Sequence, residues 1–193
     1  MKPLEWRFQR LGYATRNWGY RSLRCSIDHH ALDFENFLIE LERTTEAASF
    51  HIVAHSMGCI ITRCVLRNHH FEKLGRVIML CPPNRGSHMA RRLSTVLWRS
   101  IRTLDEITDR DDSFVNQLPA SSGVQVGIVA ASGDLVVDSE ATRLDDAIDF
   151  AMVPGMHNAV LFKQSVVDLC ANFLRAGRFK PSEHAASESA KAI

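Results

Sequence analysis

Three residues of this sequence, Ser56, Asp134 and His157, are of the types that together perform nucleophilic catalysis. A serine hydroxyl is a weak nucleophile at neutral pH, so it needs a histidine to take its proton and a carboxylate to orient that histidine. On a parallel sheet flanked by helices, such residues follow one another along the chain as serine, acid and histidine. The three residues occur in this order, so their surroundings decide whether the chain can bring them together.

Ser56 lies where one pattern of apolar residues changes to another, in FHIVAHSMGCIITR (residues 50–63). The apolar run before it is typical of a buried strand, and the apolar residues after Gly58 recur at helical spacing. Ser56 is therefore expected in a tight strand-to-helix turn that exposes its hydroxyl, with room left by Ala54 and Gly58. The N–H of Met57, at the start of the helix, would then face charge that develops beside the serine. The five residues AHSMG also fit a serine that only caps a buried helix.

Asp134 and His157 also follow strand-like segments. Asp134 comes after VQVGIVAA (124–131) and a Ser-Gly turn, and His157 comes after DFAMVP (149–154) and a Gly-Met turn. Because the carboxyl ends of parallel strands meet at one edge of a sheet, we expect both side chains at the edge that holds Ser56. Asp138 is a nearby competitor for the acid, but it lies deeper in its loop, after two apolar residues. We therefore favour Asp134.

The other histidines and the cysteines fit a catalytic or metal site less well. His55 precedes the serine, but its side chain is expected to point away from the position of the base. His88 follows a Pro-Pro-Asn-Arg-Gly loop and could line the pocket. A zinc site is not predicted, because HxH and HExxH patterns are absent. The five cysteines are odd in number and form no CxxC, so we interpret them as core residues of a protein from a reducing, cytoplasmic compartment.

The rest of the chain alternates helix-like and strand-like segments, which predicts an α/β domain with a mainly parallel sheet flanked by helices. The predicted strands are 12–20, the run before Ser56, 76–81, 124–131 and 149–154; the predicted helices are 4–11, a helix from its cap Asp28 to about Arg43, the helix after Ser56, most of 88–118, and 162–175. Leu32, Phe34 and Leu38 are expected on the buried side of the helix that Asp28 would cap. We expect one domain over residues 1–179 and a disordered tail over 180–193, since that tail is small and polar.

Length and composition exclude several other classes of protein. The chain has 193 residues, of which 46% are hydrophobic and 23% charged, as in an ordinary soluble globular domain. Its formal net charge of +1 gives no electrostatic reason to expect nucleic acid or an acidic membrane as a partner. No apolar run is long enough to span a bilayer, and the first residues lack the apolar segment of a signal peptide.

The sequence resembles the lipase-like α/β-hydrolases, in particular the small bacterial serine esterases. The resemblance rests on HIVAHSMGCIITR, GRVIMLCPPNRGSHMA, GDLVVDSEATRL, VPGMHNAVLF and FLRAGRF, which together run through most of the chain. It implies that Ser56 is the nucleophile, Asp134 the orienting acid and His157 the general base. It also implies hydrolysis of a carboxylic ester, with a lipid among the candidate substrates, through an acyl-enzyme and without metal or cofactor.

One part of the family pattern is missing from the sequence. The oxyanion hole of this fold takes one N–H from the residue after the nucleophile, here Met57, and a second from a loop that begins His-Gly after an earlier strand. No such loop precedes residues 4–11, which predicts an N-terminally shortened hydrolase domain. Asn84 or Gly86 could supply the second N–H. The alternative function is that of an impaired relic of the hydrolase fold, which acts as a binding or interaction module.

Overall fold

Four parallel strands form the centre of the protein. The computed structural model describes residues 1–21, 25–87, 106, 114–118 and 123–180. In this part of the chain the sheet has the order β1-β2-β3-β4, and every neighbouring pair is parallel. The strands are β1 (Phe50–His55), β2 (Leu74–Leu80), β3 (Gln125–Ala131) and β4 (Asp149–Val153). The predicted α/β fold with a parallel sheet is confirmed.

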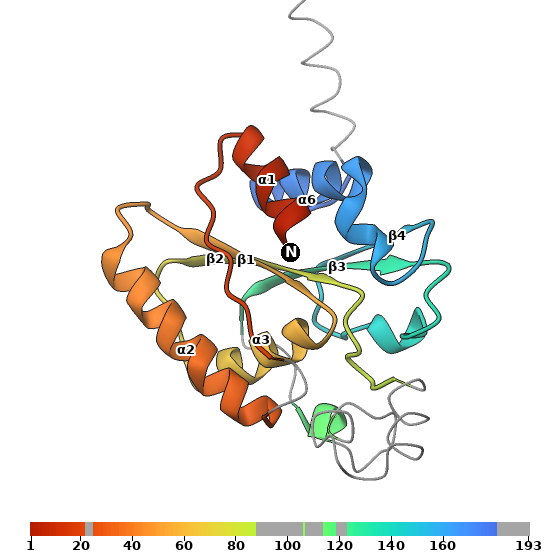
Figure 1. Cartoon of the computed structure of the whole chain (residues 1–193), viewed down its shortest axis with the longest axis horizontal. Coiled ribbons are helices and arrows are strands. Elements are labelled where there is room, and N and C mark those ends of the chain that lie inside the picture. The colour runs from red at the N-terminus through yellow and green to blue at the C-terminus, as the bar shows by residue number, and fades with distance from the viewer. Residues whose placement is uncertain (22–24, 88–105, 107–113, 119–122, 181–193) are drawn as a thin grey trace, which may run out of the picture.

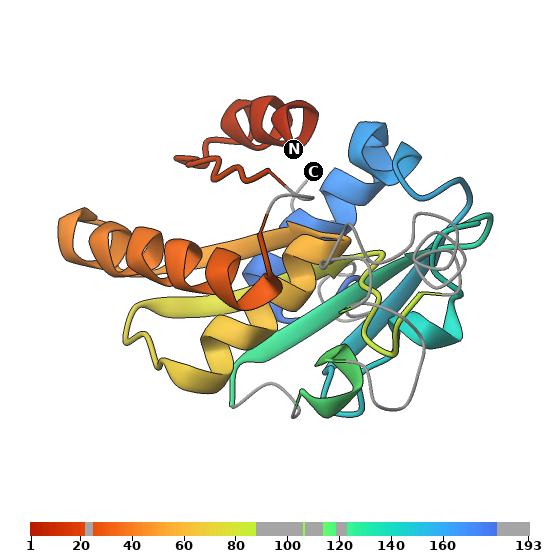
Figure 2. The same cartoon turned by 60° about the horizontal axis from the view of Figure 1, so that its bottom comes forward.

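Helices cover both faces of this sheet (Figure 1). The described helices are α1 (Lys2–Arg10), α2 (Ile27–Thr44), α3 (Met57–Asn68) and α6 (Gln164–Ala176), with short 3-10 helices η1 (Phe114–Gln117), η2 (Glu140–Thr142) and η3 (Ala159–Phe162). Helices α1 and α6 lie on one face, and α2 and α3 lie on the other, where Figure 2 brings them in front of the strands. Each layer of helices buries an apolar core against the sheet.

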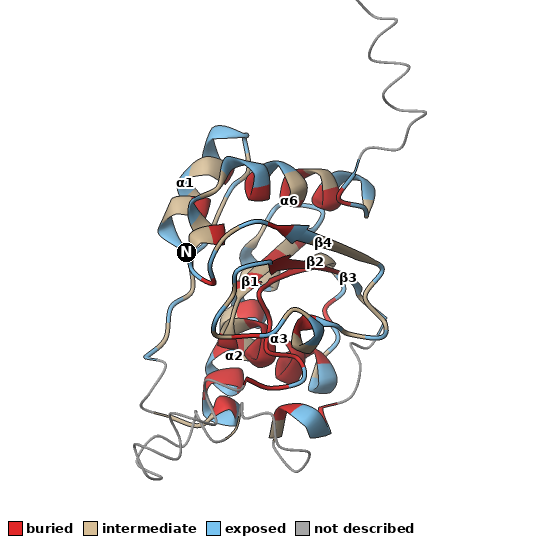
Figure 3. Ribbon diagram, turned by 90° about the vertical axis from the view of Figure 1, so that its right-hand side faces the viewer, coloured by how far each residue is buried: buried red, intermediate tan, exposed pale blue. Residues whose placement is uncertain are grey.

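The strands in the middle of the sheet are buried on both faces. All residues of β3 after Gln125 are buried, as are the last four residues of β2. Continuous apolar runs of this kind are typical of parallel strands that have helices on each side. Figure 3 shows the buried residues on the strands and on the helix surfaces that face them. This rigid centre supports the loops at the carboxyl ends of the strands.

Gly127 in β3 leaves room for the ring of Phe173 in α6, and we expect Gly127→Ala to destabilise the protein. A Cβ atom at Gly127 would lie 2.5 Å from Cε2 of Phe173, a fully buried ring that stacks on Phe179. Because the ring cannot move aside freely, we expect a loss of about 1–3 kcal/mol of unfolding free energy, measured by denaturant titration. Gly19→Ala is the matched control, since nothing lies within 4 Å of its added Cβ. An equal loss in both variants would contradict this packing argument.

The second helix, α2, differs in detail from its prediction. Ser26 rather than Asp28 is the N-cap, and its side chain accepts a hydrogen bond from the His29 N–H at 3.3 Å. Asp28 lies in the first turn, where its negative charge stabilises the helix by interacting with the positive end of the helix dipole. Phe34 and Leu38 are buried as predicted, but Leu32 is 61% exposed because it lies on the outer side of the helix.

The predicted strand at residues 12–20 does not form. This segment is extended coil after α1, and its rings of Trp18 and Tyr20 pack on the core beside Phe34 and His30. Strands are stabilised by a paired neighbour, and in the described part of the chain β1 is the edge of the sheet and pairs only with β2. Local sequence alone therefore does not make this segment a strand.

The other segment predictions have mixed outcomes. The strands near 76–81, 124–131 and 149–154 are confirmed as β2, β3 and β4, and the closing helix is confirmed as α6. Most of the predicted helical region 88–118 lies outside the described residues, apart from residue 106 and η1 with Leu118. The predicted tail lies outside them as well, except Lys180. No helix among the described residues is long and apolar enough to cross a membrane.

Candidate active site

Ser56, Asp134 and His157 all lie at the carboxyl edge of the sheet. Ser56 follows β1 directly, Asp134 follows β3 after two residues, and His157 follows β4 after three. Because the three strands are parallel, their carboxyl ends bring these loops to one side of the molecule. This position agrees with the one predicted from the sequence.

The backbone at Ser56 is strained in the way a nucleophile turn requires. Its φ of 53° and ψ of −128° are unusual for a residue with a side chain. The turn is held because the Ser56 N–H donates to Leu80 O at 2.9 Å and the Cys59 N–H donates to Ser56 O at 2.9 Å. A Cβ at Gly58 would meet only the hydroxyl of Tyr20, at 3.7 Å, so the described neighbours do not require glycine there for reasons of space.

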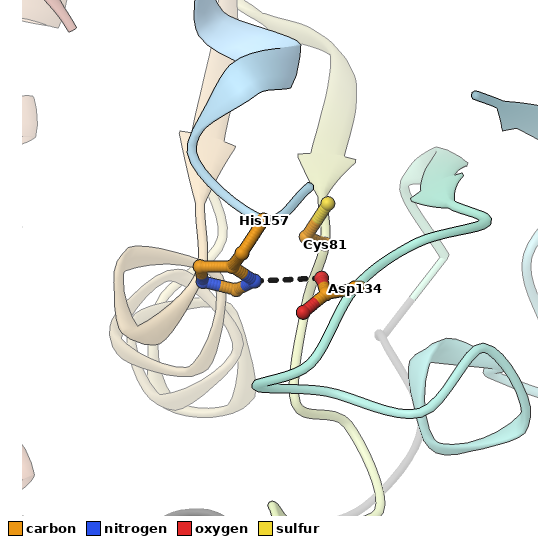
Figure 4. A group of neighbouring side chains, drawn as sticks. All are labelled: Cys81, Asp134 and His157. Carbon is orange, nitrogen blue, oxygen red and sulfur yellow. Dashed lines mark hydrogen bonds and ion pairs between the residues drawn. The ribbon is translucent and has the colours of Figure 1, made fainter. Parts of the chain in front are cut away.

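A chain of hydrogen bonds connects the three side chains. The Ser56 hydroxyl lies 2.9 Å from Nε2 of His157, and Nδ1 of His157 lies 2.7 Å from Oδ2 of Asp134. A carboxylate can only accept, so Nδ1 carries the proton and Nε2 is free to accept the serine proton. Figure 4 shows the His157 ring directed at the Asp134 carboxylate. This arrangement can transfer the proton of Ser56 to a base that is oriented by an acid.

The carboxylate of Asp134 is held in its ionised form. Burial would raise the pKa of Asp134, but hydrogen bonds from His157 and from the N–H groups of Val136 and Val137 outweigh burial, and the pKa lies below its usual value. The two N–H groups donate to Oδ1 at 2.8 and 2.9 Å, which leaves Oδ2 for His157. Asp134 therefore keeps a negative charge beside the ring. Asp138 is exposed and caps the Glu140 N–H instead.

Two backbone hydrogen bonds join the loop of Asp134 to the loop of His157. The Ser132 N–H donates to Val153 O, and the Gly133 N–H donates to Gly155 O, both at 2.9 Å. A Cβ at Gly133 would lie 3.0 Å from Gly155 O, and Gly155 itself has a φ of 131°. The glycines in the two turns thus allow the loops to approach closely. The two hydrogen bonds between the loops then fix the acid relative to the base.

The prediction for His55 is wrong. Its side chain does not point away from the base, because its Nε2 lies 3.1 Å from the backbone oxygen of His157 and the two rings are 4.9 Å apart at their centroids. Burial lowers the pKa of His55 to about 4, and the nearby His157 adds to this shift. The ring is therefore neutral at neutral pH. The alternation of side chains along a strand could not reveal a contact with a loop that follows another strand.

Cys81 is a further neighbour of the site that sequence reasoning placed only in the core. It follows β2 with a φ of 48°, and its sulfur, the Asp134 carboxylate and the His157 ring offer ligand atoms within 4.8 Å of one another (Figure 4). Burial and the charge of Asp134 raise the pKa of the Cys81 thiol to about 12, so it stays protonated. Metal ligation requires a thiolate, and His157 and Asp134 are already paired, so this group fits a triad better than a metal centre.

The four buried cysteines agree with the sequence prediction. Cys59, Cys64, Cys81 and Cys170 are buried and form no disulfide, and Cys25 is partly buried. Burial raises the pKa of the thiols of Cys64 and Cys170 to about 12. These side chains behave as small apolar residues.

The Met57 N–H is the clearest donor to a negative charge beside Ser56. It is the first residue of α3, where an N–H has no acceptor within the helix. Of the two predicted sources of a second N–H, Gly86 is engaged within its own loop, where its N–H donates to Pro83 O at 3.0 Å. Asn84 is buried and its side-chain amide donates to Thr142 O in η2 at 2.8 Å, a bond that does not involve its backbone N–H.

The sequence also matches a protein family. The family model described as "Serine hydrolase" matches residues 24–160, a range that includes Ser56, Asp134 and His157. The chain belongs to the serine hydrolase family. No curated protein matches the sequence significantly.

Solved structures similar to this serine hydrolase include bacterial and archaeal hydrolases. The mature lipase BlEst2 of Bacillus licheniformis has a TM-score of 0.60 at 14% identity, over 79% of this chain and 75% of the lipase. A carboxylesterase of Nitrososphaera gargenis has a TM-score of 0.58 at 16% identity, over 90% and 85%. A putative α/β-superfamily hydrolase of Xanthomonas campestris has a TM-score of 0.55 at 17% identity, over 91% and 88%. At these identities the likeness concerns the fold, which is that of the α/β-hydrolases.

Proposed function

We propose that this serine hydrolase cleaves carboxylic esters, with Ser56 as nucleophile, His157 as general base and Asp134 as the acid that orients it. The observation that carries the proposal is the pair of hydrogen bonds from Ser56 to His157 and from His157 to Asp134, at 2.9 and 2.7 Å. A serine that only caps a helix needs no such partners, and the Ser56 side chain makes no cap hydrogen bond to α3.

The geometry supports a two-step mechanism. Oγ of Ser56 attacks the ester carbonyl carbon while Nε2 of His157 takes the hydroxyl proton, and the Asp134 carboxylate stabilises the imidazolium that forms. The N–H of Met57 and the positive end of the α3 dipole stabilise the oxyanion. His157 then returns its proton to the departing alcohol, which leaves an acyl group on Ser56. In the second step His157 takes a proton from a water molecule as that water attacks the acyl carbonyl carbon. The bond to Oγ of Ser56 then breaks, His157 returns the proton to Oγ, and the carboxylic acid is released.

Exposed apolar side chains beside the triad favour a substrate with an apolar acyl group, such as a lipid ester. Leu135, directly after Asp134, is 80% exposed, and Met156, directly before His157, is 64% exposed. Large apolar side chains on functional loops commonly serve in binding.

The proposal predicts that a fluorophosphonate probe modifies the protein once, on Ser56. Phosphonylation requires a serine activated by a base, so only Ser56 should react among the serines of the chain. Intact-mass spectrometry should show one adduct, and peptide mapping should place it on the fragment that contains Ser56. The protein denatured in urea is the control, because unfolding separates Ser56 from His157.

A folded protein that stays unlabelled for hours, and that hydrolyses no activated ester, would contradict the proposed function. That result would favour the alternative of a binding module that keeps the hydrolase fold. Labelling on a different serine would contradict the assignment of the nucleophile.

A further inference from the structure

The general base of the proposed triad is carried by a short loop between β4 and η3. This loop contains Gly155, with a φ of 131°, and the exposed Met156. The hydrogen bonds to Ser56 and Asp134 orient the His157 ring, but the ring can be no better placed than the backbone that carries it. A reacting group that is misplaced by about 1 Å loses up to 10²-fold in rate. The anchor of this backbone therefore matters for the reaction.

The side chain of His55 supplies such an anchor. Its Nε2 lies 3.1 Å from the carbonyl oxygen of His157, and a carbonyl can only accept, so His55 is the donor. His55 is the last residue of β1, whose backbone pairs with β2 up to His55 and Leu80. The next residue is Ser56, so one rigid strand end holds the nucleophile and, through His55, the backbone of the base.

The charge of His55 also suits this position. His157 becomes a cation during the reaction, and a second cation with its ring 4.9 Å away would oppose that change. Burial keeps His55 neutral, with a pKa of about 4, so its ring donates a hydrogen bond without adding positive charge. The charged or titratable groups that act on the pKa of His55 are His157, Asp134 and the N-terminal amine.

We propose that His55 is a positioning residue, which fixes the loop of the general base by donating a hydrogen bond to the His157 carbonyl and so sets the distance from His157 to Ser56. This inference rests on the proposed ester hydrolysis for its effect on rate. The contact itself is a property of the folded protein and can be tested without turnover.

The test compares three variants of the whole protein. His55→Leu removes the donor at similar volume, His55→Asn keeps polarity with an amide too short to reach the carbonyl, and His55→Gln places an amide N–H near the position of Nε2. With p-nitrophenyl butyrate, we expect kcat to fall by about 10-fold or more in the Leu and Asn variants with little change in KM, and to stay within about threefold in the Gln variant. Thermal unfolding checks that each variant is folded.

A second measurement follows the contact directly. The proton on Nδ1 of His157, in its hydrogen bond to Asp134, should give a low-field NMR resonance in the wild type and the Gln variant. It should broaden or disappear in the Leu and Asn variants as the loop becomes mobile. Folded Leu and Asn variants that keep both kcat and this resonance would overturn the positioning role. A wild type without hydrolysis or labelling, in which the resonance still depends on residue 55, would support the positioning role and overturn the proposed function.

Discussion

The Ser56→Ala variant is expected to hydrolyse activated esters about 10⁶-fold more slowly than the wild type, measured as kcat with p-nitrophenyl butyrate. Among the described residues around the site, we expect no other group to replace the attacking oxygen. The thiol of Cys81 lies beside Asp134 and His157, but burial and Asp134 raise its pKa to about 12 and keep it protonated. A decrease of less than about tenfold would show that Ser56 is not the nucleophile.

A Ser56→Gly variant provides the matched control for folding. It also lacks the hydroxyl, so its kcat should fall as far as that of Ser56→Ala. Alanine keeps the unfavourable backbone at a φ of 53° and a ψ of −128°, whereas glycine adopts positive φ readily. We therefore expect the glycine variant to be more stable than the alanine variant by about 1 kcal/mol in denaturant titration. Equal losses of kcat in two variants that differ in stability would show that the loss comes from the missing hydroxyl and not from unfolding.

The second large effect is expected for Asp134→Asn, which should lower kcat by about 10⁴-fold. The carboxylate at Oδ2 accepts the Nδ1 proton of His157 at 2.7 Å and balances the charge that the ring acquires. An amide carries no charge, and its NH₂ group can turn toward the ring and favour the wrong tautomer. Because the amide keeps an oxygen for the N–H groups of Val136 and Val137, the loop itself should stay folded.

Asp138→Asn is the control for that prediction. Asp138 lies four residues further along the same loop and is exposed, and among the described residues its side chain accepts a hydrogen bond from the Glu140 N–H alone, at 2.9 Å. We expect its kcat to stay within about threefold of the wild type, because it makes no hydrogen bond to the base. Equal losses in the two variants would contradict the choice of Asp134 as the acid.

The sequence predicted the convergence of the three site residues well, and the reason is physical. Each follows an apolar run that is long enough for one buried strand and ends in a turn, and parallel strands bring such turns to one edge. The catalytic roles of Ser56, Asp134 and His157 and of the Met57 N–H remain predictions until the variants are measured. The domain limits at residues 179 and 180 also remain predictions.

Contacts between distant segments account for what the sequence did not predict. The His55 ring meets the loop after β4, and Cys81 meets Asp134 through the pairing of β2 with β3, so neither contact has a local signal. The segment 12–20 has the composition of a strand but lacks a partner in the described part of the chain. The cap of α2 was misplaced by two residues, because Ser26 and Asp28 both favour helix starts and only the backbone geometry distinguishes them.

The order of the strands in the sheet has a consequence for the kinetics of folding. The strands lie side by side in the order in which they occur in the chain, so each one can pair with a neighbour that has already been placed. His157 follows the last strand, whereas Ser56 lies 101 residues earlier, after the first. The two residues therefore meet when β4 docks on β3, which is the pairing that carries His157 to the edge of the sheet that holds Ser56. The return of hydrolytic activity during refolding would thus mark the last pairing step, after most of the helical signal has already recovered.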